Sequence, residues 1–86
     1  MPINVYSAVG NKDEVAWLCK DSWNLPDQIE ALRIWIGSTD LPKGEYVADV
    51  GFMVRSDASG GGAVMEPDFL RTLADSGITL FLSEYL

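Results

Sequence analysis

Apolar and polar residues alternate most clearly over residues 46–55, and a period of two is typical of a half-buried strand. One face of this stretch carries Tyr46, Ala48, Val50, Phe52 and Val54, and the other carries Val47, Asp49, Gly51, Met53 and Arg55. Residues 3–9 are rich in β-branched and aromatic side chains, and residues 78–86 place Ile78, Leu80 and Leu82 on one face. We therefore expect a strand at each end of the chain and one in its middle.

Two other stretches have the spacing of amphipathic helices. In the first, Asn11 precedes an acidic first turn, and the apolar positions that follow are Val15, Leu18 and Cys19. This pattern predicts a helix that ends near residues 21–23, before Pro26. In the second, Pro67 opens a stretch with an apolar stripe of Phe69, Leu70, Leu73 and Ala74, and Gly77 follows where a helix-ending glycine is expected.

Residues 28–37 fit two interpretations. Leu32, Ile34 and Ile36 alternate with Arg33, Trp35 and Gly37, which indicates a strand over Ala31–Ile36. Residues 26–31 are equally compatible with the first turn of a helix, so the start of this element stays open.

Together these elements predict the order strand, helix, strand, strand, helix, strand in one domain, residues 1–86. This order is typical of an α+β fold, the ferredoxin-like βαββαβ two-layer sandwich, with an antiparallel four-stranded sheet and two helices on one face. If the even-numbered residues of 46–55 pack under the helices, then Val47 and Met53 point outward, together with Trp35, Phe81 and Tyr85. An exposed apolar face of this kind marks an interface. The alternative is an opposite register in one strand, which would place these large side chains in the core.

Charge changes the picture of possible partners. Asp and Glu number 13 against 6 Lys and Arg, a formal net charge of −7. Direct binding to nucleic acid or to an anionic membrane is therefore not expected. The charge suits a protein partner with a basic surface. We expect the contacts from acids on the first helix and in the middle loop, namely Asp13, Glu14, Asp21, Asp40 and Glu45.

The chain offers little for catalysis or for binding metals and cofactors, and we predict no site of any of these kinds. It contains no His, and its single Cys19 excludes an internal disulfide. The glycine tract at residues 60–62 lacks the Lys of a phosphate-binding loop, so it is interpreted as a flexible connection. The amino terminus lacks the features of a secretory signal, and no apolar run is long enough to cross a membrane, so the expected location is the cytoplasm.

The carboxyl-terminal half combines the strand that starts at Tyr46, a helix with the sequence Phe69-Leu70-Arg71-Thr72-Leu73-Ala74, and a strand that opens on Gly77-Ile78. With these features, Tyr46–Leu86 resembles the corresponding half of a bacterial domain family of unknown function, which implies the fold and no activity. In size, acidity and lack of catalytic residues the chain is similar to phage anti-CRISPR proteins and toxin-immunity proteins.

These likenesses suggest a stoichiometric inhibitor that occupies a basic surface of a nucleic-acid-handling bacterial defence complex. Two alternatives stay open. One is a homodimeric, ACT-like regulatory or structural domain that pairs through its open sheet face. The other is a toxin-immunity protein.

Overall fold

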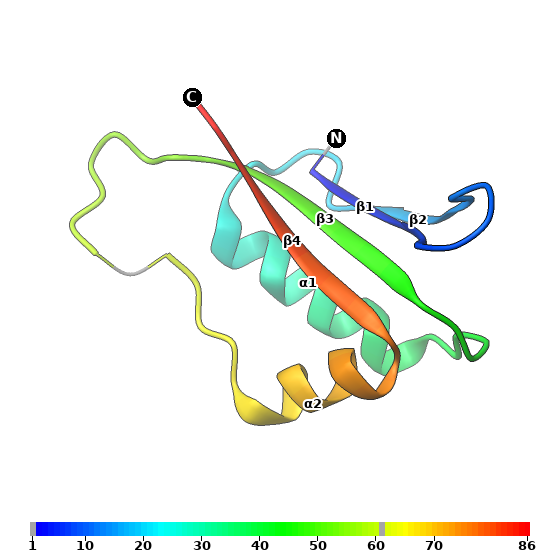
Figure 1. Ribbon diagram of the computed structural model, residues 1–86. Coiled ribbons are helices and arrows are strands. Elements are labelled where there is room, and N and C mark those ends of the chain that lie inside the picture. Colours follow the sequence, from blue (N-terminus) through cyan, green and yellow to red (C-terminus); the bar gives the residue numbers. More distant parts are fainter. Residues whose placement is uncertain (1, 61) are drawn as a thin grey trace.

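The computed structural model describes residues 2–60 and 62–86. Over these residues the chain forms four strands and two helices (Figure 1). In chain order they are β1 (Ile3–Ser7), β2 (Glu14–Leu18), α1 (Leu25–Ser38), β3 (Tyr46–Met53), α2 (Pro67–Asp75) and β4 (Ile78–Tyr85). Both helices lie on the same side of the sheet (Figure 1), so the predicted two-layer α+β arrangement is confirmed.

The sheet is mixed and open, with the strand order β2-β1-β3-β4. Strand β1 pairs antiparallel with both β2 and β3, whereas β4 pairs parallel with β3. The expected antiparallel ferredoxin-like sheet is therefore not observed. The parallel pair arises because α2 lies between β3 and β4 and returns the chain to the end of the sheet where β3 began.

The predicted first helix is wrong, because residues 14–18 form β2. Gly10 and Lys12 have φ values of 66° and 55°, which the start of a helix does not accommodate, and they belong to the turn of a β1–β2 hairpin. In the hairpin, Ala16 and Leu18 turn toward the core while Trp17 is exposed. The apolar spacing also covers little more than one helical turn, which is too short to hold a helix against competing strand pairing.

The predicted strand over Ala31–Ile36 is also wrong, because these residues belong to α1. The alternation at Leu32, Ile34 and Ile36 is broken in the structure, since Ile34 is 58% exposed while the other two are buried. The buried stripe runs through Gln28, Ile29, Leu32 and Ile36, which is helical spacing. Trp35 consequently leaves the predicted open face and packs, half-buried, against the core from the helix.

The core lies between the helices and one face of the sheet. The sheet supplies Ile3, Val5, Tyr46, Ala48, Val50 and Ile78, and the helices supply Ile29, Leu32, Ile36, Phe69 and Leu73. Of the even-numbered residues of 46–55 that were expected to pack under the helices, Tyr46, Ala48 and Val50 are buried, so the expected face of β3 is confirmed for these three.

Two local features join the layers. The side-chain Nε2 of the buried Gln28 donates hydrogen bonds to the carbonyl oxygens of Ser22 and Gly51, at 2.8 and 2.6 Å, and so ties α1 to the sheet. Gly77 ends α2 at φ 74°, as predicted, and its carbonyl accepts a hydrogen bond from Tyr46 at 2.8 Å. A Cβ on Gly77 would lie 2.1 Å from the Gly44 carbonyl oxygen, so the close approach of the two loops requires glycine at this position.

Candidate functional site: the open sheet face

The sheet face opposite the helices is the candidate site, and we call it the open face. Strand register fixes its members, because residues paired directly across strands point to the same side. One row runs Trp17, Asn4, Asp49, Phe81 across all four strands. The flanking rows run Glu14, Tyr6, Val47, Thr79 on one side and Gly51, Ser83 and then Met53, Tyr85 on the other.

Large apolar side chains on the open face remain exposed to solvent. Trp17 is 47% exposed and Phe81 is 56% exposed, at opposite ends of the same row. Met53 and Tyr85 are 44% and 43% exposed at one end of the sheet. Trp23 packs edge-on against Tyr85 there, with ring centroids 5.7 Å apart, and extends the aromatic surface. Aromatic residues and Met that stay exposed together are enriched at protein interfaces.

Polar groups interrupt this apolar surface at its centre. Ser83 Oγ donates a hydrogen bond to Asp49 Oδ1 at 2.6 Å, which orients the carboxylate within the sheet. At the β2 edge, Lys20 Nζ lies 4.7 Å from the centroid of the Trp17 ring, a cation–π contact. The open face thus combines exposed aromatic area with a few charged groups.

One end of the sheet gathers four of the five predicted acidic residues. The β1–β2 turn and the loop before β3 meet there, since Ser7 N–H bonds to the Asp13 carbonyl and Ala8 N–H to the Glu45 carbonyl, both at 2.9 Å. Asp40 lies in the same loop as Glu45, between α1 and β3. Glu14 shares a row of the open face with Tyr6. We call Asp13, Glu14, Asp40 and Glu45 the acidic end.

The remaining predicted residues divide into those the structure brings together and those it does not. Val47, Met53 and Phe81 lie on the open face as predicted. Asp21 follows β2 at the opposite end of the sheet from the acidic end, and Trp35 lies in the helical layer.

Sequence reasoning missed Trp17 and Trp23 as members of the open face. Trp17 was hidden by the helical interpretation of residues 11–21. The signal that could have found it is the alternation of Ala16 and Leu18 with Trp17. Trp23 lies outside the strands, so no strand period reports its position.

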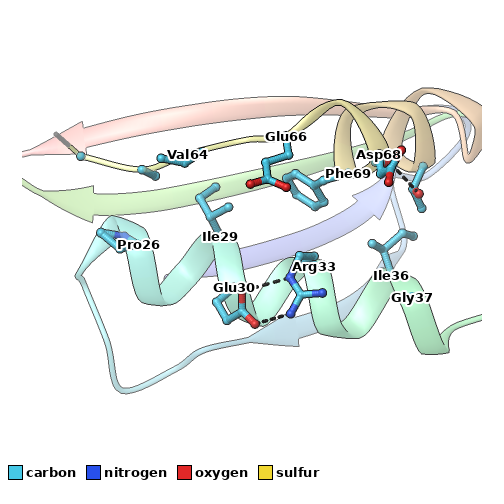
Figure 2. Close-up of a pocket in the computed structure, with 13 residues that line it drawn as sticks. Pro26, Ile29, Glu30, Arg33, Ile36, Gly37, Val64, Glu66, Asp68 and Phe69 are labelled. Carbon is cyan, nitrogen blue, oxygen red and sulfur yellow. Dashed lines mark hydrogen bonds and ion pairs between the residues drawn. The ribbon is translucent and has the colours of Figure 1, made fainter.

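The helical layer contains a separate hollow of about 810 Å³ between α1 and the segment that leads into α2 (Figure 2). Its walls include Ile29, Ile36 and Phe69. Arg33 faces it but is held by Glu30, to which its Nε donates at 3.0 Å, and these hydrogen bonds raise the pKa of the Arg33 guanidinium. Because the carboxylates of Glu66 and Asp68 also line the hollow, its charge does not favour an anionic ligand.

Cys19 does not contribute a reactive group to either surface. It follows β2 at φ 53° and packs, half-buried, against the core. Burial raises the pKa of its thiol above the ordinary value, and the Asp27 charge raises it further, so the thiol stays protonated at neutral pH. Among residues 2–60 and 62–86, no three His, Cys, Asp or Glu side chains are grouped to hold a metal ion.

Comparison with family models, with curated proteins and with solved structures gives no match to this chain. No helix among the described residues has the length and apolar character needed to cross a membrane.

Proposed function

We propose that the chain acts without catalysis, by stoichiometric binding of its open face and acidic end to a protein partner with a basic surface. The observation that carries the proposal is the position of Trp17 and Phe81 in one exposed row of the sheet, next to a row that contains Glu14. Exposed aromatic side chains of this kind, with polar and charged groups between and beside them, are enriched at protein interfaces.

The distribution of charge supports a basic partner. Two salt bridges join the described residues, Glu30–Arg33 and Asp68–Arg71, and both lie on the helices. They neutralise two of the 6 basic side chains away from the open face, while the chain as a whole keeps a net charge of −7. The turn and loop that form the acidic end also carry Lys12 and Lys43, so its four carboxylates exceed its lysines by two. This excess of negative charge attracts a basic surface at long range, which accelerates encounter.

The more specific proposal is an inhibitor of a nucleic-acid-handling complex. A basic groove that normally holds a phosphate backbone is attractive to clustered carboxylates for the same electrostatic reason. Glu14 and Asp49 on the open face, with the other residues of the acidic end beside them, supply such carboxylates next to an apolar anchor. Binding of the chain and of nucleic acid to this partner would then be mutually exclusive.

The test begins with capture of partners from a bacterial lysate on the immobilised chain, identification by mass spectrometry, and measurement of affinity with the purified partner. The double reversal Glu14→Lys with Glu45→Lys should weaken binding by several kcal/mol, since attraction becomes repulsion. The same reversal at Asp21 and Asp57, away from the acidic end, changes the net charge equally and should have a much smaller effect.

Two further results decide the proposal. Added DNA or RNA should displace the chain from the partner, and binding should weaken as salt is raised. Affinity that is insensitive to salt and to the reversal of Glu14 and Glu45 would reject a basic partner. Simultaneous binding of nucleic acid and the chain would reject the inhibitor.

A further inference from the structure

The two edges of the sheet are built differently. The β2 edge is five residues long, its register with β1 shifts between Val5 and Tyr6, and left-handed residues flank it at Lys12 and Cys19. Short length and irregular register are devices that keep an edge strand from pairing with another chain. Strand β4 has eight residues in continuous register with β3, without Pro or Lys, and its single charge is Glu84. Strand β4 therefore lacks these protections.

The outer side of β4 presents a regular row of backbone groups. The Gly77 carbonyl accepts a hydrogen bond from Tyr46 N–H, and the Tyr85 carbonyl accepts one from Val54 N–H. The odd-numbered residues of 77–85 therefore direct their backbone groups toward β3. In a parallel pair the alternate residues then direct theirs away from β3. These are Ile78, Leu80, Leu82 and Glu84. Strand β4 stands at the edge of the sheet, and among residues 2–60 and 62–86 no strand pairs with this outer side.

We propose that β4 pairs antiparallel with β4 of a second copy of this chain, with the two-fold axis at Phe81, to form a continuous eight-stranded sheet. This register places Leu80 opposite the partner's Leu82 and Ile78 opposite the partner's Glu84. The four residues whose backbone groups point away from β3 then lie opposite residues of the partner whose backbone groups point toward them. Every outer N–H and C=O of the strand therefore gains a hydrogen-bond partner.

The side chains agree with the same register. On the open face, Phe81 lies opposite Phe81 of the second copy, and Thr79 lies opposite the partner's Ser83. No charged side chain lies directly opposite one of the same sign. Leu82, which is 42% exposed in the single chain, becomes covered by Leu80 of the other copy. A second copy therefore fits this edge better than an arbitrary extended peptide does.

Antiparallel pairing also separates the acidic ends of the two molecules. The acidic end lies where β4 begins, next to Gly77 and Glu45. A strand of eight residues extends about 26 Å at 3.3 Å per residue. Because this exceeds the screening length of about 10 Å at 0.1 M salt, repulsion between the two acidic ends is weak at physiological ionic strength.

Light scattering on the full chain at millimolar concentration tests the assembly, and should give twice the 9.4 kDa of one copy. Leu82→Pro removes an outward N–H that β3 does not use, and Leu82→Lys places a charge at the edge. Both should give monomers with an unchanged circular dichroism spectrum. Val15→Lys on the opposite edge, where Val15 is 39% exposed, should leave the dimer intact.

Disulfide cross-linking tests the register. In a Cys19→Ser background, Phe81→Cys should cross-link two copies rapidly on oxidation, because residues at the axis face their own copies at a distance a disulfide spans. Thr79→Cys should cross-link far more slowly, since it faces the partner's Ser83. Equal cross-linking of the two variants would overturn the register.

A monomer at millimolar concentration would overturn the pairing itself. A dimer that persists in Leu82→Lys but is lost in Trp17→Ala would show that the copies meet through the open face instead, and would equally overturn it. Edge pairing can be tested apart from the proposed partner binding, because a Leu82→Lys monomer still presents Trp17 and the acidic end.

Discussion

The two faces of the sheet both carry apolar side chains, but one face buries them and the other leaves them exposed to solvent. On the helix side, Ile3, Val5 and Val50 have no solvent exposure, whereas on the open face Trp17 and Phe81 keep about half of their surface in water. The helices cover one face of the sheet and enclose the core there. Apolar area on the other face therefore does not contribute to this core. The covered face therefore holds the stabilising core, and the exposed apolar area of the other face supports our proposal that it binds a partner.

The largest expected effect comes from a cavity on the covered side. Leu32 is completely buried, and Leu32→Ala should lower the free energy of unfolding by about 2–5 kcal/mol in urea titrations. Ile34→Ala on the same helix removes an exposed side chain, and its expected cost stays below about 1 kcal/mol. Equal losses for the two variants would contradict the assignment of α1 as an amphipathic helix over this core.

A smaller loss is expected where a polar side chain bridges the two layers. Gln28→Leu keeps the volume but leaves the Gly51 and Ser22 carbonyls without their Nε2 donor. The free energy of unfolding should fall by about 1–3 kcal/mol, because a buried acceptor without a donor costs that much. An unchanged denaturation midpoint would mean that these hydrogen bonds do not hold α1 to the sheet.

Truncation on the open face should have little effect on stability. Trp17→Ala and Phe81→Ala each remove an aromatic ring from a half-exposed position, so we expect the midpoint of thermal unfolding to fall much less than in Leu32→Ala. Differential scanning calorimetry of the three variants makes the comparison. A loss at Trp17 as large as that at Leu32 would place Trp17 in a second core.

The smallest expected effect is the pH dependence contributed by Glu30. Hydrogen bonds from Arg33 lower the pKa of Glu30 below its ordinary value of 4.5. The pair therefore adds stability above that value, and the addition disappears as pH falls through the lowered pKa in the folded protein. The difference in unfolding free energy between the wild type and Glu30→Gln should shrink on acidification from pH 7 to 3, and a difference that grows would contradict this sign.

How far the sequence predicts the structure depends on the element. The long alternation of Tyr46–Met53 was sufficient to predict a strand and both of its faces, and the Pro67 start and Gly77 end located α2. Leu32, Ile34 and Ile36 misled because three alternate residues fit a strand and, in part, one side of a helix. Burial of Gln28 decides between them, and that burial depends in part on its hydrogen bond to the carbonyl of Gly51, which is distant in sequence.

Only the part of the candidate site that lies on regularly alternating strands could be predicted. Val47, Met53 and Phe81 follow from the strand period, so their face could be read directly. The acidic end could not, because it forms only when the β1–β2 hairpin and the loop before β3 meet at one end of the sheet. Trp17 was not predicted on the open face because residues 14–18 were interpreted as part of a helix, whereas they form β2.

Our central proposal, that the open face binds a protein partner, is tested most directly by capturing partners with two matched variants. Trp17→Ala with Phe81→Ala alters the open face at residues 47% and 56% exposed, and Ile34→Ala with Leu70→Ala alters the helices at residues 58% and 46% exposed. Quantitative mass spectrometry of proteins retained from a bacterial lysate should show partners lost by the first variant and kept by the second. Partners kept by the open-face variant and lost by the helix variant would contradict the account.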